Sequence, residues 1–214
     1  MTSMRRRVLS GLMATALLTA CAAPGLAQSQ PESLGTFKAW TAWKANDGYG
    51  AMCFISSAPE DMSPKQTADG TPINRDPANF LVLHREKAPA INPDGTGAKD
   101  AAGNPVFRKA RNEVQTLVGY PMRPTTDSFF HAATVDGKRY AMRSIPDDAT
   151  TNSNESEGAW LSSTEDEPDF VAALKAGTKL VVMGTSNRSG LELSDTYSLA
   201  GFTAAMAAID KACP

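Results

Sequence analysis

Residues 128–145, with the sequence SFFHAATVDGKRYAMRSI, indicate the fold class most directly. Two runs that contain strand-forming residues flank Asp136 and Gly137. An Asp-Gly pair favours a two-residue β-hairpin turn, because glycine readily adopts the positive φ angle that a type I′ turn requires. We therefore predict antiparallel strands over residues 128–135 and 138–145.

The hairpin pattern continues on both sides of this segment. Residues 178–186 and 191–197 flank a second turn at residues 187–190. Four further strand-like runs occupy residues 37–44, 49–56, 80–85 and 113–120. Helix is mostly absent between these runs, which disfavours the crossovers that a parallel sheet needs. The sequence therefore predicts a mainly β fold, an antiparallel β-sandwich of about eight strands.

Two helices are expected near the C-terminus. A short one covers residues 166–176, and a second covers residues 199–212 with Ser198 as its N-cap. The second helix carries an apolar stripe at steps of three and four residues, which predicts that it packs on the sheet. The stripe consists of Leu199, Phe202, Met206 and Ile209.

The spacing of the cysteines predicts one disulfide. Cys213 lies four residues beyond Ile209, so the apolar stripe directs it toward the core. Cys53 shares a strand face with Ile55 by the alternation of side chains. These two cysteines form an even pair in an oxidising compartment, provided that Cys21 is removed or lipidated. We predict a Cys53–Cys213 disulfide, with two buried thiols as the alternative.

The beginning of the chain has the composition of an export signal. Three arginines at residues 5–7 precede the apolar residues 8–19, a run too short to span a bilayer. Small residues before Gln28 predict a signal peptide over residues 1–27. The tetrapeptide Leu-Thr-Ala-Cys that ends at Cys21 also fits a lipobox, which would give a lipoprotein signal over residues 1–20 and a lipidated Cys21.

The remainder of the chain is expected to hold a flexible leader over residues 28–36 and a single domain over residues 37–214. The chain has 214 residues, of which 42% are apolar and 21% charged, enough for one sizeable core. The net charge is −2, and it becomes −5 when cleavage of the signal peptide removes three arginines. Because nucleic-acid surfaces are recognised by basic proteins, a nucleic-acid partner is disfavoured.

No catalytic signature is present in the sequence. It lacks the Gly-x-Ser-x-Gly elbow, the phosphate-binding Walker loop and the His-Glu-x-x-His zinc motif. The two histidines, His84 and His131, lie in strand-like runs, and we interpret both as structural. A metal site built from both would still need a carboxylate. We therefore predict no catalytic residue, no metal and no cofactor.

Two irregular segments and a basic cluster are candidates for function. Residues 57–79 and 87–112 are rich in Pro, Gly, Asp and Asn, and loops of this length are usually functional or disordered. The second segment ends in Arg108, Lys109 and Arg111. This cluster would form either a solvated edge or a contact surface for an acidic partner.

Trp40 is a further candidate for a contact surface. If residues 37–44 form one strand, Phe37 and Trp43 share one face, and Trp40 shares the other with Lys44. Trp43 is then expected in the core. Trp40 is expected to be half exposed, either at an interface or beneath a long loop.

The C-terminal region carries motifs of a known family. The motifs are GTSNRSG at residues 184–190 and DTYSLAGF at 195–202, with Ala205, Ile209, Asp210 and Cys213 after them, and CFI at 53–55 and VGYP at 118–121 before them. This pattern resembles the invasion-associated locus B family, exported proteins of alphaproteobacteria. The resemblance covers nearly all of residues 37–213. It implies a secreted, periplasmic or outer-membrane-associated β-sandwich linked to host-cell invasion, and it implies no catalytic residue.

The DTYSLAGF motif also has a physical interpretation as a corner between a strand and a helix. Gly201 lets the backbone approach a neighbour closely, and Phe202 fills the core. This interpretation requires no ligand at the motif.

Together these observations predict an exported, non-enzymatic envelope protein that acts through contacts with an unidentified protein at the envelope or on a host surface. We expect it to be periplasmic or secreted, or a membrane-anchored lipoprotein, with no transmembrane segment in the mature chain. The alternative is a periplasmic ligand-binding module or envelope enzyme with a pocket under residues 57–79 and 87–112. An exposed aromatic patch would favour the first, and a concave pocket with convergent polar groups the second.

Overall fold

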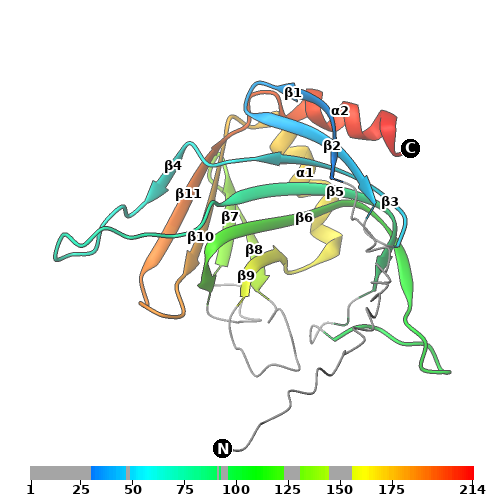
Figure 1. Cartoon of the computed structure of the whole chain (residues 1–214), viewed down its shortest axis with the longest axis horizontal. Coiled ribbons are helices and arrows are strands. Elements are labelled where there is room, and N and C mark those ends of the chain that lie inside the picture. Colours follow the sequence, from blue (N-terminus) through cyan, green and yellow to red (C-terminus); the bar gives the residue numbers. More distant parts are fainter. Residues whose placement is uncertain (1–29, 47–48, 91, 93–95, 123–130, 145–155) are drawn as a thin grey trace, which may run out of the picture.

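Eleven antiparallel strands dominate the computed structural model, which describes residues 30–46, 49–90, 92, 96–122, 131–144 and 156–214 (Figure 1). The strands are β1 (Glu32–Phe37), β2 (Trp40–Asn46), β3 (Ala51–Ser57), β4 (Asp61–Ser63), β5 (Asn79–Pro89), β6 (Phe107–Met122), β7 (His131–Val135), β8 (Lys138–Ser144), β9 (Ser156–Leu161), β10 (Lys179–Thr185) and β11 (Glu192–Ser198). The helices are α1 (Glu167–Ala176), which follows a single 3-10 turn, and α2 (Phe202–Ala212).

All the strands belong to one sheet, in the order β1-β2-β3-β5-β6-β9-β8-β7-β10-β11-β4. The sheet curls on itself, because Phe80 of β5 and Tyr197 of β11 lie with ring centroids 5.8 Å apart although six steps separate their strands. Helix α1 lies inside the curl, where Phe170 contacts Phe80 at 6.1 Å and Tyr140 at 4.4 Å. A single aromatic core therefore joins the two halves of the sheet.

The mainly β, antiparallel fold with a C-terminal helix and one further short helix is confirmed. The strands differ from the expected sandwich in number and arrangement, because they form one continuous sheet of eleven rather than two sheets of about eight strands in all. Strands β1, β4 and β9 were not expected. The leader predicted over residues 28–36 is wrong from Glu32 onward, since β1 pairs with β2 along its length.

The Asp136-Gly137 hairpin is confirmed, with φ angles of 44° and 93° at the two turn residues. The turn also fixes the start of β10, because the Asp136 carboxylate accepts hydrogen bonds from the backbone N–H of Thr178 at 2.8 Å and of Lys179 at 3.2 Å. These hydrogen bonds, those from Thr178 above all, lower the pKa of Asp136.

Helix α2 begins later than expected, at Phe202, because the chain first makes a corner at Gly201 with a φ angle of 94°. Ser198 is therefore the last residue of β11 and not the N-cap. A Cβ atom at Gly201 would lie 1.9 Å from the backbone oxygen of Phe37, so the close approach predicted for this glycine is present. Phe202 is fully buried, as predicted.

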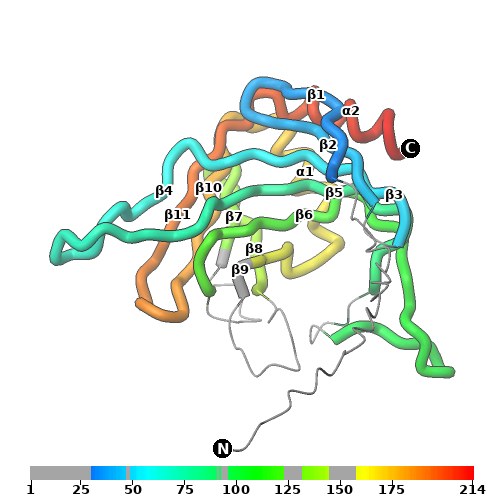
Figure 2. Tube along the Cα trace, in the orientation of Figure 1, coloured from blue at the N-terminus to red at the C-terminus, as the bar shows by residue number. Residues whose placement is uncertain are grey.

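The predicted Cys53–Cys213 disulfide is present, and it joins β3 to the end of α2 with 6.0 Å between the Cα atoms. Figure 2 shows α2, at the C-terminal end of the trace, beside β1 and β2. The disulfide therefore clamps the last helix onto the first three strands of the sheet.

The exposures expected for the two early tryptophans are reversed. Trp40 is fully buried, packs edge-on against Phe202 at 4.9 Å and donates from Nε1 to the Ser198 carbonyl. Trp43 lies on the outer face and stacks on Phe54. The chain turns at Lys38, so the alternation does not run unbroken through residues 37–44. Trp40 is therefore not part of a contact surface.

The two irregular segments are partly strand. β4 lies within residues 57–79, and β5 and β6 extend the ladder at both ends of residues 87–112. Their central parts are two hairpin-like projections, which we call the first projection (residues 64–78) and the second projection (residues 98–106). They extend to opposite sides of the molecule in Figure 1.

Candidate functional site

A basic pocket lies where β2, β3, β5 and β6 meet the end of α2. Its volume is about 300 Å³, and we call it the C-terminal pocket. Its lining includes Lys44, His84, Arg85, Glu86, Lys109, Arg111 and the last three residues of the chain. The strand register explains this grouping, because Lys44 pairs with Cys53 and Cys53 pairs with His84. Cys213, one of the two cysteines of the disulfide, therefore lines the pocket.

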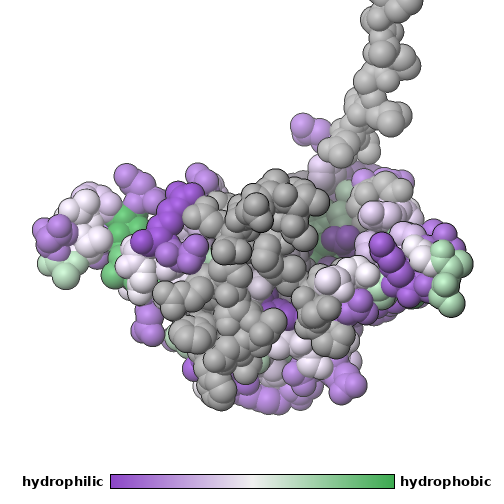
Figure 3. Space-filling view, turned by 90° about the horizontal axis from the view of Figure 1, so that it is seen from below, coloured by the Kyte–Doolittle hydropathy of each residue, from purple (hydrophilic) through white to green (hydrophobic). Residues whose placement is uncertain are grey.

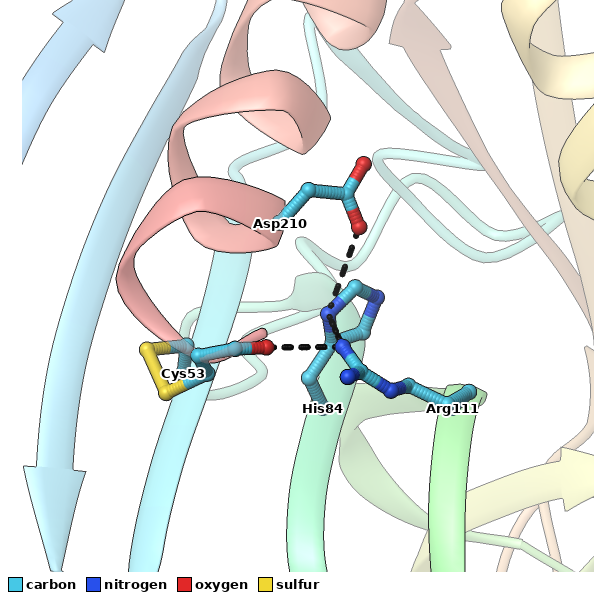
Figure 4. The surroundings of a disulfide bond; sticks show 5 residues. Cys53, His84, Arg111 and Asp210 are labelled. Carbon is cyan, nitrogen blue, oxygen red and sulfur yellow. Dashed lines mark hydrogen bonds and ion pairs between the residues drawn. A yellow bond between two sulfur atoms is a disulfide. The ribbon is translucent and has the colours of Figure 1, made fainter.

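Arg111 connects the pocket to the disulfide (Figure 4). Its Nη1 donates to the carbonyl oxygen of Cys213 at 2.7 Å and lies 3.3 Å from Nδ1 of His84. Since an arginine can only donate, Nδ1 of His84 accepts in this contact. Arg111 therefore holds the end of the chain against β5 and β6.

His84 is buried and has a partner at each ring nitrogen. Its Nε2 lies 3.2 Å from Oδ1 of Asn112 and donates a hydrogen bond to it, and a carboxylate oxygen of Asp210 lies 3.6 Å from Nδ1. Burial lowers the pKa of His84, so the neutral ring is favoured. These contacts are those of a histidine with a structural role. The side chain of His131 lies outside the described residues.

The predicted basic cluster is divided by the strand. Lys109 and Arg111 line the C-terminal pocket, whereas Nη2 of Arg108 lies 3.9 Å from Oε2 of Glu113. Alternation in β6 places neighbouring residues on opposite faces, which accounts for the division. Lys44 and Arg85 join the pocket from β2 and β5, and no local signal in the sequence distinguishes them. Only the register of strands far apart in the sequence brings them there.

An aromatic surface adjoins the pocket. The ring of Tyr49, which is 50% exposed, lies 5.4 Å from Phe107, and Nζ of Lys87 lies 4.4 Å from the centre of the Phe107 ring. Phe107 shares a face of β6 with Lys109 and Arg111 by alternation. We call Tyr49, Lys87 and Phe107 the aromatic surface. Within this surface Tyr49 and Lys87 are exposed and Phe107 is partly buried.

A second charged cluster lies at the start of α1. Oε2 of Glu113 is 3.9 Å from Nε of Arg85 and from Nη2 of Arg108. Glu167 is buried nearby, and burial raises its pKa to about 7, with Arg108 lowering the pKa and Glu113 raising it. Burial therefore outweighs the attraction of Arg108 and opposes the ionisation of Glu167.

Within the described ranges, no group of three or more His, Cys, Asp and Glu side chains is placed to hold a metal ion. In the same part of the chain, neither helix combines the length and the apolar character that crossing a membrane requires. Cys21 lies outside the described residues.

The structure thus defines a disulfide-clamped antiparallel β protein with a basic pocket at its C-terminal end. The family model described as Invasion associated locus B (IalB) protein matches residues 148–210. The match confirms the resemblance to this family over that segment, which includes β9, α1, β10, β11 and most of α2. No match was found among curated proteins or among solved structures.

Proposed function

We propose that this chain is an exported, non-enzymatic envelope protein that binds an acidic segment of a partner protein at the C-terminal pocket. One observation carries the proposal. Four basic side chains from three strands line a single pocket, although the chain as a whole is acidic: Lys44, Arg85, Lys109 and Arg111. Glu86 is the one acidic side chain in the pocket lining, and Glu113, which lies outside the lining, pairs with Arg85.

The aromatic surface supports the same interpretation. Exposed charge pairs each contribute only about 0.2–1 kcal/mol, so charge alone gives weak binding. Tyr49 and Phe107, with Lys87 against the Phe107 ring, add apolar contact area beside the charges. An acidic peptide that carries one apolar residue would contact both features.

Export is supported by the disulfide, because such bonds persist in oxidising compartments. We propose that the protein is periplasmic or secreted after cleavage behind residue 27, or a membrane-anchored lipoprotein that begins at Cys21. Mass spectrometry of the mature protein from its native cells distinguishes the two forms. A chain that begins at Gln28 supports the signal peptide, and a diacylated Cys21 supports the lipoprotein. An unprocessed Met1 would contradict export.

The binding proposal is tested with the disulfide-bonded protein, residues 28–214, and a fluorescent Glu-rich peptide that contains one Phe. The double variant Lys44→Gln/Lys109→Gln should bind about tenfold more weakly than the wild type. The control variant Lys99→Gln/Lys179→Gln has the same net charge and changes two exposed lysines outside the pocket. Equal affinity of the two variants would contradict the proposal.

A further inference from the structure

A second, larger pocket lies between the first projection and the turn that joins β10 to β11. Its volume is about 450 Å³, within the range of small-molecule sites. Apolar side chains of Ile73, Tyr120, Leu191 and Leu193 line it together with Arg75. It belongs to different strand ends from the C-terminal pocket. Binding at this pocket is therefore independent of the proposed function.

Arg75 is the unusual residue of this pocket. Its side chain and that of Asp195 are both more than nine-tenths buried, and Nη2 of Arg75 forms an ion pair and a hydrogen bond with Oδ1 of Asp195. The guanidinium carbon lies 5.4 Å from the centre of the Tyr120 ring. These two contacts hold the guanidinium in one place on the pocket wall.

The other terminal nitrogen of Arg75 has no such contact. Nη1 is buried, and among the described residues no atom accepts a hydrogen bond from it. Buried donors are almost always paired, and an unpaired charged donor is especially costly. An acceptor supplied by a ligand in this pocket would satisfy it.

The charges around the pocket indicate what kind of acceptor fits. Asp195 neutralises Arg75 at the wall, and the exposed rim carries one residue of each sign, Arg188 and Asp76. A ligand therefore meets no net charge. A neutral carbonyl oxygen with an apolar group beside it matches a lone N–H next to apolar walls.

The first projection is held firmly enough to shape such a site. The backbone N–H of Asp76 donates to the Gly119 carbonyl at 2.9 Å, and Gly119 has a φ angle of 66°. A Cβ atom at Gly119 would lie 1.8 Å from the Asp76 carbonyl oxygen. The projection thus rests directly on the backbone of β6 beside Arg75.

We infer that this pocket binds an uncharged peptide-like ligand, whose amide carbonyl accepts a hydrogen bond from Nη1 of Arg75 while its apolar side chain packs on Tyr120 and the leucines. This binding site is separate from the C-terminal pocket, although both lie on the same sheet. Ligand binding here does not depend on the proposed acidic partner.

Calorimetry with the disulfide-bonded protein, residues 28–214, tests this inference. The probes are the tripeptide acetyl-Ala-Leu-Ala with an amide at its C-terminus and the same tripeptide with a free carboxylate. The capped peptide should bind with a Kd below about 1 mM and at least as tightly as the carboxylate form. No binding of the capped peptide, or binding of the carboxylate form alone, would overturn the inference.

Two variants assign the binding to this pocket. Arg75→Met/Asp195→Asn removes both members of the buried pair, leaves no lone buried charge and should weaken binding about tenfold or more. Lys44→Gln/Lys109→Gln, in the C-terminal pocket, should bind the capped peptide like the wild type. Loss of binding in the second variant, or full binding in the first, counts against the site.

If the variant that lacks the buried Arg75–Asp195 pair does not fold, hydrogen exchange in the wild-type protein still tests the site. On addition of the capped peptide, backbone amide exchange should slow in residues 73–76 and 186–193. Slowing that is confined to other parts of the sheet would place the ligand elsewhere and overturn the inference.

Discussion

Arg111 and Cys213 are 102 positions apart in the chain, yet Nη1 of Arg111 donates a hydrogen bond of 2.7 Å to the carbonyl oxygen of Cys213. This contact joins the start of β6 to the end of the chain directly beside the disulfide. The basic pocket and the disulfide therefore form one structural unit. We therefore expect a change in the pocket to affect the disulfide, and a change in the disulfide to affect the pocket.

The disulfide should contribute strongly to stability. It closes a loop with a sequence separation of 160, and the chain-entropy model gives about 5 kcal/mol for such a loop. We expect the double variant Cys53→Ala/Cys213→Ala to lose about 2–5 kcal/mol in the free energy of unfolding, as measured by urea denaturation. A loss under about 1 kcal/mol would show that the clamp is not a main support of the fold.

Two glycines with positive φ angles provide a matched test of the corner before α2. Gly201 has a φ angle of 94° and touches Phe37, whereas Gly190 has a φ angle of 69° and no atom within 4 Å of an added Cβ. Gly190→Ala should cost about 1 kcal/mol for the backbone conformation alone. Gly201→Ala should cost about 3 kcal/mol or more, because the backbone must also move apart. Equal costs in thermal unfolding would refute the close packing.

Because Glu167 is buried, its contribution to the free energy of unfolding should fall as the pH rises. Its pKa is raised from 4.5 to about 7 in the folded protein, so the unfolded chain loses this proton first. The contribution of Glu167 to the free energy of unfolding is unchanged below pH 4.5, decreases between pH 4.5 and 7, and is constant above pH 7. Each pKa unit corresponds to about 1.4 kcal/mol.

The variant Glu167→Gln isolates this effect. Its free energy of unfolding should increase relative to the wild type between pH 4.5 and 7, by about 3–4 kcal/mol in total. Urea titrations at a series of pH values measure the difference. A difference that does not vary with pH would mean that Glu167 ionises normally in the folded protein.

His84 should have the opposite effect. Burial lowers its pKa below the ordinary value of 6.5, so the unfolded chain binds the proton more readily than the folded one. Stability from this residue is fully present above pH 6.5 and is lost as the pH falls below that value. The variant His84→Gln should therefore lose less stability than the wild type on acidification. An identical acid sensitivity would contradict the neutral, buried ring.

Local signals in the sequence are sufficient to predict the turns and helices that depend only on neighbouring residues. The Asp136-Gly137 turn follows from backbone geometry, and the stripe of Phe202, Met206 and Ile209 follows from helical periodicity. Cys53 and Cys213 were paired because each shares a face with apolar neighbours. These predictions needed no knowledge of how distant strands meet.

Tertiary structure decided the rest. Alternation continued through residues 37–44 places Trp40 on the wrong face, because the chain reverses at Lys38 between β1 and β2. The curl of the sheet depends on contacts such as that of Phe80 with Tyr197, which no local pattern contains. Lys44 and Arg85 reach the C-terminal pocket only through the strand register.

The proposed function requires that the C-terminal pocket bind an acidic segment of a partner. Chemical-shift mapping of the isotope-labelled wild-type protein with the Glu-rich peptide tests this binding. We predict that the largest shifts fall on the amides of Lys44, Ala51, Lys109, Arg111 and Cys213, and that they disappear at high salt. Shifts centred on β10 and β11, or none at peptide concentrations near 1 mM, would contradict binding at this pocket.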